Sequence, residues 1–218
     1  MTAAAAMTGQ RIVVSAGPTF EDIDPVRFIG NRSSGKMGFA LAAAAARRGA
    51  EVVLVAGPVA LATPADVQRI DVRSARQMHD TVLAALPAQV YIGTAAVADY
   101  TPARVAPAKI KKHAGHLTLD LVPTADILAD VAAHPLRPRL VVGFAAETDN
   151  VEIHARGKLD SKQLDLIAAN RVGIAGSGFE SDDNALTIYW AGGERAFDPA
   201  PKTELAEQLL DLIAERLR

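Results

Sequence analysis

Cysteine is absent from this sequence of 218 residues, and several kinds of protein are excluded with it. A chain without thiols forms no disulfide, holds no metal through thiolates and uses no cysteine nucleophile. The composition is consistent with a reducing compartment, and we expect the protein to be cytoplasmic. No apolar run reaches the roughly 18 residues that cross a bilayer, so the sequence predicts no membrane partner.

A marked excess of charge is missing as well. The formal net charge is −2, which argues against a broad nucleic-acid-binding face but leaves room for a local basic pocket for phosphates. The first residues are rich in alanine and lack the basic region of a signal peptide. We interpret residues 1–10 as disordered or as a remnant, and residues 11–218 as a single domain.

A large core is available, because 50% of the residues are hydrophobic. Short apolar runs bounded by turn residues predict strands at residues 11–15, 51–56, 67–72, 89–93, 140–143, 164–169 and 186–190. Helices are expected at residues 33–48 (capped by Ser33 or Ser34), 74–86 (Ser74), 124–133 (Thr124), 150–162 (Asn150) and from Lys202 onward. This alternation predicts an α/β fold with a Rossmann-like, doubly wound sheet.

One segment interrupts the alternation. Residues 109–121 resemble a β-hairpin with alternating leucines and a turn near Ala114 and Gly115. We therefore expect a mostly parallel sheet with an inserted β-hairpin. The hairpin would begin with Lys109, Lys111 and Lys112, a cluster of cations that suits a polyphosphate. A charged strand edge that deters aggregation fits these lysines equally well, and both interpretations stay open.

Residues 30–37 (GNRSSGKM) partly match a phosphate-binding loop. Met37 stands where a P-loop has Ser or Thr to hold magnesium, and the segment lies well beyond the preceding predicted strand. An orthodox P-loop is therefore disfavoured, although the following helix still offers its first N–H groups to an anion. Gly35 and Gly38 weaken the start of that helix, which indicates close approach by a ligand or by backbone.

Two further segments leave predicted strands at their carboxyl ends, where open α/β sheets bind ligands. Residues 93–100 (GTAAVADY) are small enough for a base or sugar to approach, and Asp99 could bind a ribose or magnesium. A tightly packed crossover is the alternative. In residues 143–148 (GFAAET), Phe144 could stack on a base or belong to the core. Lys158 and Lys162, one helical turn apart, could share a phosphate or be solvated.

Together these segments resemble the bacterial phosphopantothenoylcysteine synthetase family. The resemblance runs from about residue 11 to the C-terminus and is most specific at five ordered motifs: residues 24–38 (DPVRFIGNRSSGKMG), 95–100 (AAVADY), 109–112 (KIKK), 143–148 (GFAAET) and 179–184 (FESDDN). In many bacteria this domain follows a flavin-dependent decarboxylase, which this chain lacks. The resemblance therefore implies either a free-standing enzyme or a domain excised from such a fusion.

The family implies a ligase of coenzyme A biosynthesis that joins 4′-phosphopantothenate to L-cysteine. CTP is the implied co-substrate, the carboxylate is activated as an acyl-cytidylate with release of pyrophosphate, and the cysteine amine then displaces CMP. Magnesium and a homodimer are also expected. The family's catalytic positions fall on Asn31, which would hold the acyl-cytidylate, on Lys109, which would neutralise the triphosphate, and on Arg27. Its nucleotide-binding positions fall on Ala95, Ala96, Asp99, Lys109, Ala125, Asp126, Ile127, Leu128, Phe144, Lys158 and Lys162, with Asp99 also a candidate metal ligand.

Two positions depart from the family pattern. Ala125 stands where many relatives have proline, and Phe20 replaces a more usual arginine, so no substrate contact is carried over to Phe20. Two other functions also stay open. A kinase would use residues 30–36 as a phosphate loop and release a nucleoside diphosphate, whereas a binding module would hold a nucleotide without catalysis.

Overall fold

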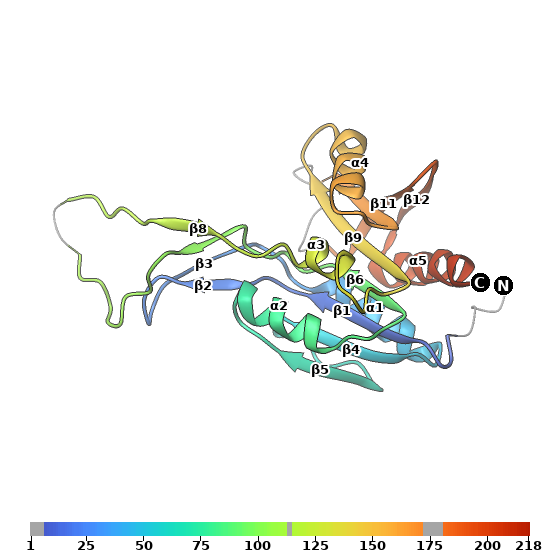
Figure 1. Ribbon diagram of the computed structural model, residues 1–218, viewed down its shortest axis with the longest axis horizontal. Coiled ribbons are helices and arrows are strands. Elements are labelled where there is room, and N and C mark those ends of the chain that lie inside the picture. Colours follow the sequence, from blue (N-terminus) through green and yellow to red (C-terminus); the bar gives the residue numbers. More distant parts are fainter. Residues whose placement is uncertain (1–6, 113–114, 172–180) are drawn as a thin grey trace.

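The computed structural model of the protein describes residues 7–112, 115–171 and 181–218. Its centre is an eight-stranded sheet in the order β12-β11-β10-β9-β6-β1-β4-β5 (Figure 1). All pairings from β10 to β5 are parallel, and β11 and β12 add an antiparallel edge. The strands are β1 (Arg11–Ala16), β4 (Glu51–Ala56), β5 (Val67–Asp71), β6 (Val90–Gly93), β9 (Leu140–Glu147), β10 (Leu166–Arg171), β11 (Asp183–Trp190) and β12 (Gly193–Pro201).

The parallel strands follow the order of a doubly wound Rossmann-like sheet, which confirms the predicted fold class. Helices cover both faces, and each face has its own apolar core. One face carries α1 (Lys36–Arg47) and α5 (Lys202–Leu217), and the other carries α2 (Ala75–Ala84), α3 (Ile127–Ala132) and α4 (Val151–Ser161). In the described part of the chain, no helix combines the length and apolarity needed to cross a membrane.

A long arm extends from the carboxyl edge of the sheet (Figure 1). It consists of two antiparallel pairs: β2 (Phe20–Asp22) with β3 (Phe28–Gly30), and β7 (Tyr100–Pro102) with β8 (Leu121–Pro123). The first pair lies in a segment for which the sequence predicted no strand. The stacked rings of Phe20 and Phe28, 3.9 Å apart, with Arg73 against them, stabilise this pair.

The inserted hairpin differs from the prediction. Its paired strands are β7 and β8, so the hairpin expected over residues 109–121 is wrong: of its described residues only Leu121 lies in a strand. In the described part of residues 103–120 the chain forms no strand. The backbone of Ile110 bonds to Asp24 and Arg27 instead of to a partner strand, and these bonds outweigh the alternation of the leucines. The expected turn includes Ala114, which lies outside the described residues.

The domain also begins earlier than residue 11. Met7 is 1% exposed in the core beside α1, and its backbone N–H donates to the carbonyl of Arg48 (2.8 Å). The start of the fold was placed too late because an isolated methionine after a run of alanines carries no periodic signal. At the other end, β12 was missed, although Ala191 and Gly192 form a turn that pairs it with β11.

Helix caps were predicted with mixed success. Ser74 caps α2 in a capping box with Gln77, as expected. Ser33 and Ser34 do not cap α1, because the N-cap is Gly35, with φ 76° and no side-chain hydrogen bond. The cap of α3 is Asp126 rather than Thr124, since the Asp126 carboxylate accepts from the N–H of Ala129 (3.2 Å).

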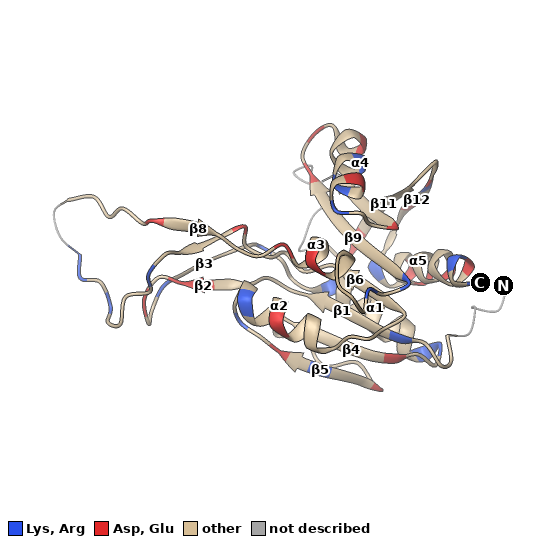
Figure 2. Ribbon diagram, in the orientation of Figure 1, with Lys and Arg blue, Asp and Glu red and all other residues tan. Residues whose placement is uncertain are grey.

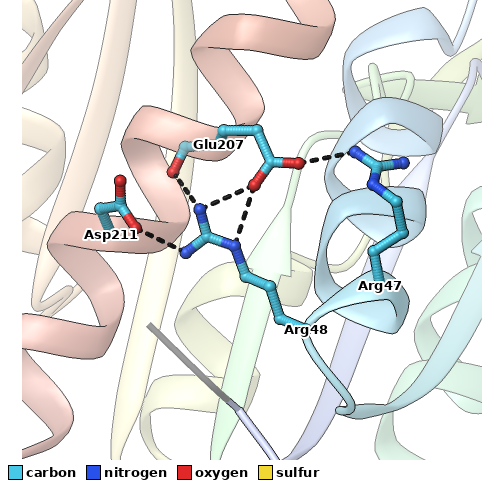
Figure 3. A network of polar contacts seen from close by, with 4 residues as sticks. All are labelled: Arg47, Arg48, Glu207 and Asp211. Atoms are coloured by element: carbon cyan, nitrogen blue, oxygen red, sulfur yellow. Dashed lines mark hydrogen bonds and ion pairs between the residues drawn. The ribbon is translucent and has the colours of Figure 1, made fainter. Parts of the chain in front are cut away.

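Helices α1 and α5 are joined by a nearly buried arginine (Figure 3). Arg48, whose side chain is 4% exposed, donates to the Glu207 carboxylate and carbonyl and to Asp211. Arg47 donates to the other carboxylate oxygen of Glu207 (2.6 Å). Partial burial by itself raises the pKa of Glu207, but the hydrogen bonds from Arg47 and Arg48 outweigh it and hold that pKa below its ordinary value.

This network predicts a dependence of stability on pH. Because the pKa of Glu207 is lower in the folded chain than in the unfolded chain, its contribution to stability is present above an ordinary glutamate pKa of about 4.3 and is lost as the pH falls through the folded value. We expect Glu207→Gln to destabilise the protein near neutral pH and to approach wild type in acid. Urea denaturation at several pH values measures this. Glu204→Gln, on an exposed part of α5, is the control, and a Glu207→Gln deficit that does not change with pH would contradict the network.

A second prediction concerns the approach of α1 to the sheet. A Cβ at Gly38 would meet Oγ1 of Thr94 and lie 2.5 Å from Cβ of Ala16, and Thr94 is fixed by its bond to the Ser15 carbonyl (2.7 Å). Gly38→Ala should therefore lower the free energy of unfolding by about 1–3 kcal/mol. Gly157 in α4 has nothing within 4 Å of such a Cβ, so Gly157→Ala should raise it by up to about 1 kcal/mol. Equal effects of the two changes in chemical denaturation would show that the helix packs less closely than described.

Candidate functional site

A cavity of about 430 Å³ opens at the carboxyl edge of the sheet, where the chain leaves β1 and β6 toward opposite faces. From β1 the chain passes through the arm to α1, whereas from β6 it reaches α3 on the other face. Connections that diverge in this way leave a crevice between them, and open α/β sheets bind their ligands there. The cavity is therefore the candidate site.

The floor of the cavity is polar but uncharged. Ser15 on β1 and Tyr91 on β6 are each 1% exposed, and their hydroxyl oxygens lie 2.9 Å apart. Burial raises the pKa of Tyr91, so its phenol stays neutral. A neutral hydroxyl pair can donate and accept hydrogen bonds without adding charge to the site.

One wall is the loop after β6, and its backbone is fixed from several sides. The N–H of Ala96 donates to the carbonyl of Gly17 (2.9 Å), and the N–H of Ala98 donates to Oγ1 of Thr19 (2.9 Å). Oγ1 of Thr124 donates to the carbonyl of Ala98 (2.6 Å). Because the side chains of this wall are small, a planar ligand can reach the backbone.

Asn31 holds the same wall from the side of α1. Its Nδ2 donates to the carbonyls of Ala96 (3.1 Å) and Val97 (3.0 Å). The residue follows β3 directly and lines the cavity. The side-chain amide thus joins the segment before α1 to the loop after β6, so Asn31 shapes the cavity as well as facing it.

The start of α1 forms the opposite wall. Residues 33–38 line the cavity, and the left-handed Gly35 turns the chain into the helix without a side-chain cap. The first N–H groups of such a helix attract an anion. Gly38 allows this wall to approach β1 and β6 closely, in agreement with the close backbone approach that the sequence indicated.

Among the described residues of the lining, cations outnumber acids. Lys158 pairs with Glu147 (2.7 Å), and Lys162 pairs with Asp126 (2.8 Å), on the side of α3 and α4. Such an excess of lysines suits a ligand with several negative charges. The charged lining residues are Lys36, Lys158, Lys162, Lys202, Asp99 and Asp126.

The other two lysines lie on the side of α1 and α5. Lys36 pairs with Asp182 (2.7 Å), and Lys202, which is 6% exposed, donates from Nζ to the carbonyl of Ser181. Burial, and then repulsion from Lys36, lowers the pKa of Lys202. An anion between the two pairs of lysines would therefore meet positive charge from both faces of the sheet.

The cavity brings together nearly all of the residues that the sequence indicated. They come from five separate segments and share one lining: Asn31, Ala95, Ala96, Asp99, Ala125, Asp126, Ile127, Leu128, Phe144, Lys158 and Lys162. The structure thus confirms that these segments lie together. Their individual roles toward a ligand stay predictions.

Lys109 and Arg27 do not line this cavity. Both belong to the arm, whose basic loop lies at its far end (Figure 2). Arg27 lines a separate cavity of about 240 Å³ together with Lys111 and Lys112, whereas the exposed Lys109 lines neither. In this arrangement the arm does not present Lys109 to the residues around Phe144.

Several lining residues were not singled out from the sequence as individual site residues. Ser15, Tyr91, Thr94 and Thr124 are common in strands and loops, and no spacing marks them. In the last motif, residues 179–180 lie outside the described residues, but Asn184 lines the cavity and accepts from Nδ2 of Asn170 (3.3 Å). In the described residues, no cluster of three or more histidine, aspartate or glutamate side chains could hold a metal ion, so Asp99 has no such partners.

Fold and cavity together define a doubly wound α/β protein with a candidate ligand site at the topological switch point. The sequence profile of the family described as "DNA/pantothenate metabolism flavoprotein C-terminal domain" matches residues 7–217, and the chain belongs to this family. This agrees with the resemblance drawn from the motifs.

The chain is 51% identical over 214 residues to the coenzyme A biosynthesis bifunctional protein CoaBC of Vibrio cholerae, covering 97% of the chain and 54% of that protein. It is 53% identical over 209 residues to CoaBC of Escherichia coli strain K12, covering 94% and 52%. The crystal structure of the C-terminal domain of a CoaBC protein is similar, with a TM-score of 0.81, 40% identity and 96% of each chain covered. The chain spans about half the length of the curated relatives that it matches.

The two hydrogen bonds from Asn31 to the loop after β6 lead to a testable prediction. In Asn31→Asp a carboxylate oxygen replaces Nδ2, faces two carbonyl oxygens about 3 Å away and has no hydrogen to donate. We expect faster hydrogen exchange at residues 94–98, measured by mass spectrometry. Arg32→Gln is the control, because it makes the same change in net charge at the neighbouring exposed residue. Unchanged exchange in Asn31→Asp would mean that the amide does not hold the wall.

Proposed function

We propose that this chain is a ligase that joins 4′-phosphopantothenate to L-cysteine, with CTP as the activating nucleotide. The observation that carries the proposal is the cavity at the switch point, with small backbone walls and lysines on both sides. The family of the chain supports it, because the relatives that match are bifunctional proteins of coenzyme A biosynthesis.

The proposed reaction has two steps. In the first, a carboxylate oxygen of phosphopantothenate attacks the α-phosphorus of CTP, the bond from that phosphorus to the bridging oxygen breaks, and pyrophosphate leaves. In the second, the amine nitrogen of cysteine attacks the acyl carbon of the acyl-cytidylate, CMP leaves, and the nitrogen loses a proton. Neither step needs a nucleophile from the protein, in keeping with the absence of cysteine.

The protein's share of the work is then positioning and neutralisation of charge. On the side of α4, Lys158 and Lys162 can exchange their carboxylate partners for phosphate oxygens. The small wall at residues 95–97 allows the base to bond to backbone groups, and Phe144 offers it a ring. Asn31, fixed to that wall, would lie beside the acyl-phosphate linkage.

Magnesium fits the same lining. It is usually held by one or two protein carboxylates together with phosphate oxygens and water, so no cluster of acids is required. Asp99 is exposed within the cavity lining, and Asp126 belongs to the same lining. We propose that these carboxylates hold the ion when it arrives with CTP, and that the ion adds positive charge next to the phosphates.

We also propose that the arm associates with a second copy of the chain. Isolated two-stranded ribbons are only marginally stable. This arm also exposes several large apolar side chains to solvent. They lie on both ribbons and on the loop between β7 and β8: Val26, Phe28, Tyr100, Val105, Leu117, Leu121 and Val122. Contact between two arms would cover this surface, and sedimentation of the purified chain tests it.

The decisive experiment is pyrophosphate release. We expect release when the chain is given CTP, magnesium and phosphopantothenate, formation of phosphopantothenoylcysteine when cysteine is added, and slower turnover with ATP. A kinase would release CDP or ADP instead, and a binding module would release no pyrophosphate. Turnover with ATP equal to that with CTP would refute the proposed nucleotide while leaving the ligase reaction intact.

A further inference from the structure

The arm contains a buried carboxylate that the proposed chemistry leaves without a role. Asp24 lies in the turn between β2 and β3, and its side chain is fully buried although Val26 and Phe28 beside it are exposed. Burying a charged carboxylate is unfavourable unless hydrogen bonds replace the water that it loses. The groups that bond to Asp24 therefore indicate what the residue does.

Asp24 accepts hydrogen bonds from its own turn and from residue 110, which is far away in the sequence. Oδ1 accepts from the backbone N–H groups of Val26 (2.8 Å) and Arg27 (2.9 Å), which closes the turn. Oδ2 accepts from Nε of Arg27 (3.0 Å), from Nη2 of Arg27, and from the backbone N–H of Ile110 (3.1 Å). Nη2 of Arg27 also donates to the carbonyl of Ile110 (2.8 Å). The backbone N–H and the carbonyl of Ile110 are thus both hydrogen-bonded to the ion pair of Asp24 and Arg27.

This arrangement keeps Asp24 charged. The hydrogen bond from Arg27 is the largest influence and, with the backbone N–H groups and against the effect of burial, holds the pKa of Asp24 well below its ordinary value. The carboxylate of Asp24 is therefore ionised at neutral pH and can accept all of these hydrogen bonds. Exposed ion pairs on the surface, by contrast, contribute little to stability.

Ile110 stands in the middle of the basic cluster. Lys109 precedes it, Lys111 follows it, and Arg27, Lys111 and Lys112 line the cavity of the arm. A second bond, from the N–H of Ala106 to the carbonyl of Ile23 (2.9 Å), holds the same loop a little earlier. Fixing the backbone between two lysines limits the volume that their ammonium groups can reach.

We propose that Asp24 is a positioning residue, whose carboxylate fixes Ile110 to Arg27 and thereby sets where Lys109 presents positive charge to phosphate groups that approach the arm. The inference rests on the proposed function, because Lys109 meets phosphates only if the chain acts on CTP and phosphopantothenate. Asp24 itself touches neither substrate. Its effect passes through the lysine segment, so it should disappear when Lys109 no longer carries charge.

The first test needs no activity. Asp24→Asn keeps the size of the side chain but turns an N–H donor toward Arg27 and Ile110, which should free the loop. We expect trypsin to cleave after Lys109, Lys111 or Lys112 at least about tenfold faster than in wild type, because cleavage follows local opening. Asp22→Asn is the matched control, since Asp22 lies two residues away, is half-exposed and pairs with Arg73. Equal cleavage of wild type and Asp24→Asn overturns the inference.

The second test is a double-mutant cycle on pyrophosphate release. We expect Asp24→Asn to lower kcat/KM for CTP about tenfold or more, but to lower it less than about twofold further in a Lys109→Gln background, because the two residues act as a unit. Any loss of thermal stability should be the same in both backgrounds. A full tenfold loss in the Lys109→Gln background would make Asp24 a purely structural residue and overturns the proposal.

A further variant covers the case in which Asp24→Asn does not fold. Ile110→Pro removes the backbone N–H that donates to Asp24, together with the isoleucine side chain and the tryptic site after Lys109, and leaves the pair of Asp24 with Arg27 in place. It should reproduce both the faster cleavage and the loss of kcat/KM, and wild-type behaviour in both assays overturns the inference. An inactive wild type refutes the proposed function instead, and the cleavage assay then decides alone whether Asp24 anchors the loop.

Discussion

The divergence of the chain at β1 and β6 is the constraint on which the site depends. Two adjacent parallel strands end side by side, but the connection from one returns over α1 and the connection from the other over α3. The backbone cannot fill the space between them, so a cavity is built into the topology. Small residues shape this cavity. Gly38 lets α1 pack close to β1, and the alanines after β6 have side chains too small to fill the space. The charges of the lysines matter only because this geometry places them around one space.

Much of the architecture could be predicted from the sequence, because hydrophobic periodicity reflects burial. The runs at β1, β4 and β6 are buried on both faces and therefore read as continuous apolar segments. The arm could not be predicted in the same way. Its strands are three residues long, their packing is mutual rather than against the main core, and the bonds of Asp24 to Ile110 join positions far apart in the chain. No local pattern reports such a bond.

The candidate site was predictable to the extent that its residues lie in motifs. Asn31, Asp126 and Phe144 were each indicated by neighbours in sequence, and the parallel order of the strands then brought them together. Lys202 was missed, because a lysine at the start of an amphipathic helix normally points into water. Only the fold shows that this helix begins at the edge of the cavity. For Lys109 the motif indicated the kind of chemistry, a positive charge for phosphate groups, but it did not indicate where the fold places the residue.

The bond between Met7 and Arg48, and the bonds from Arg48 to α5, have a practical consequence. They place the first described residues beside the last helix, on the opposite side of the molecule from the arm (Figure 1). A tag or surface tether attached at either terminus would leave the mouth of the cavity and the whole arm accessible. Because residue 7 lies this close to the last helix, a short linker could join the two and new ends be opened elsewhere, for instance at the turn between β11 and β12, so the fold is suited to circular permutation.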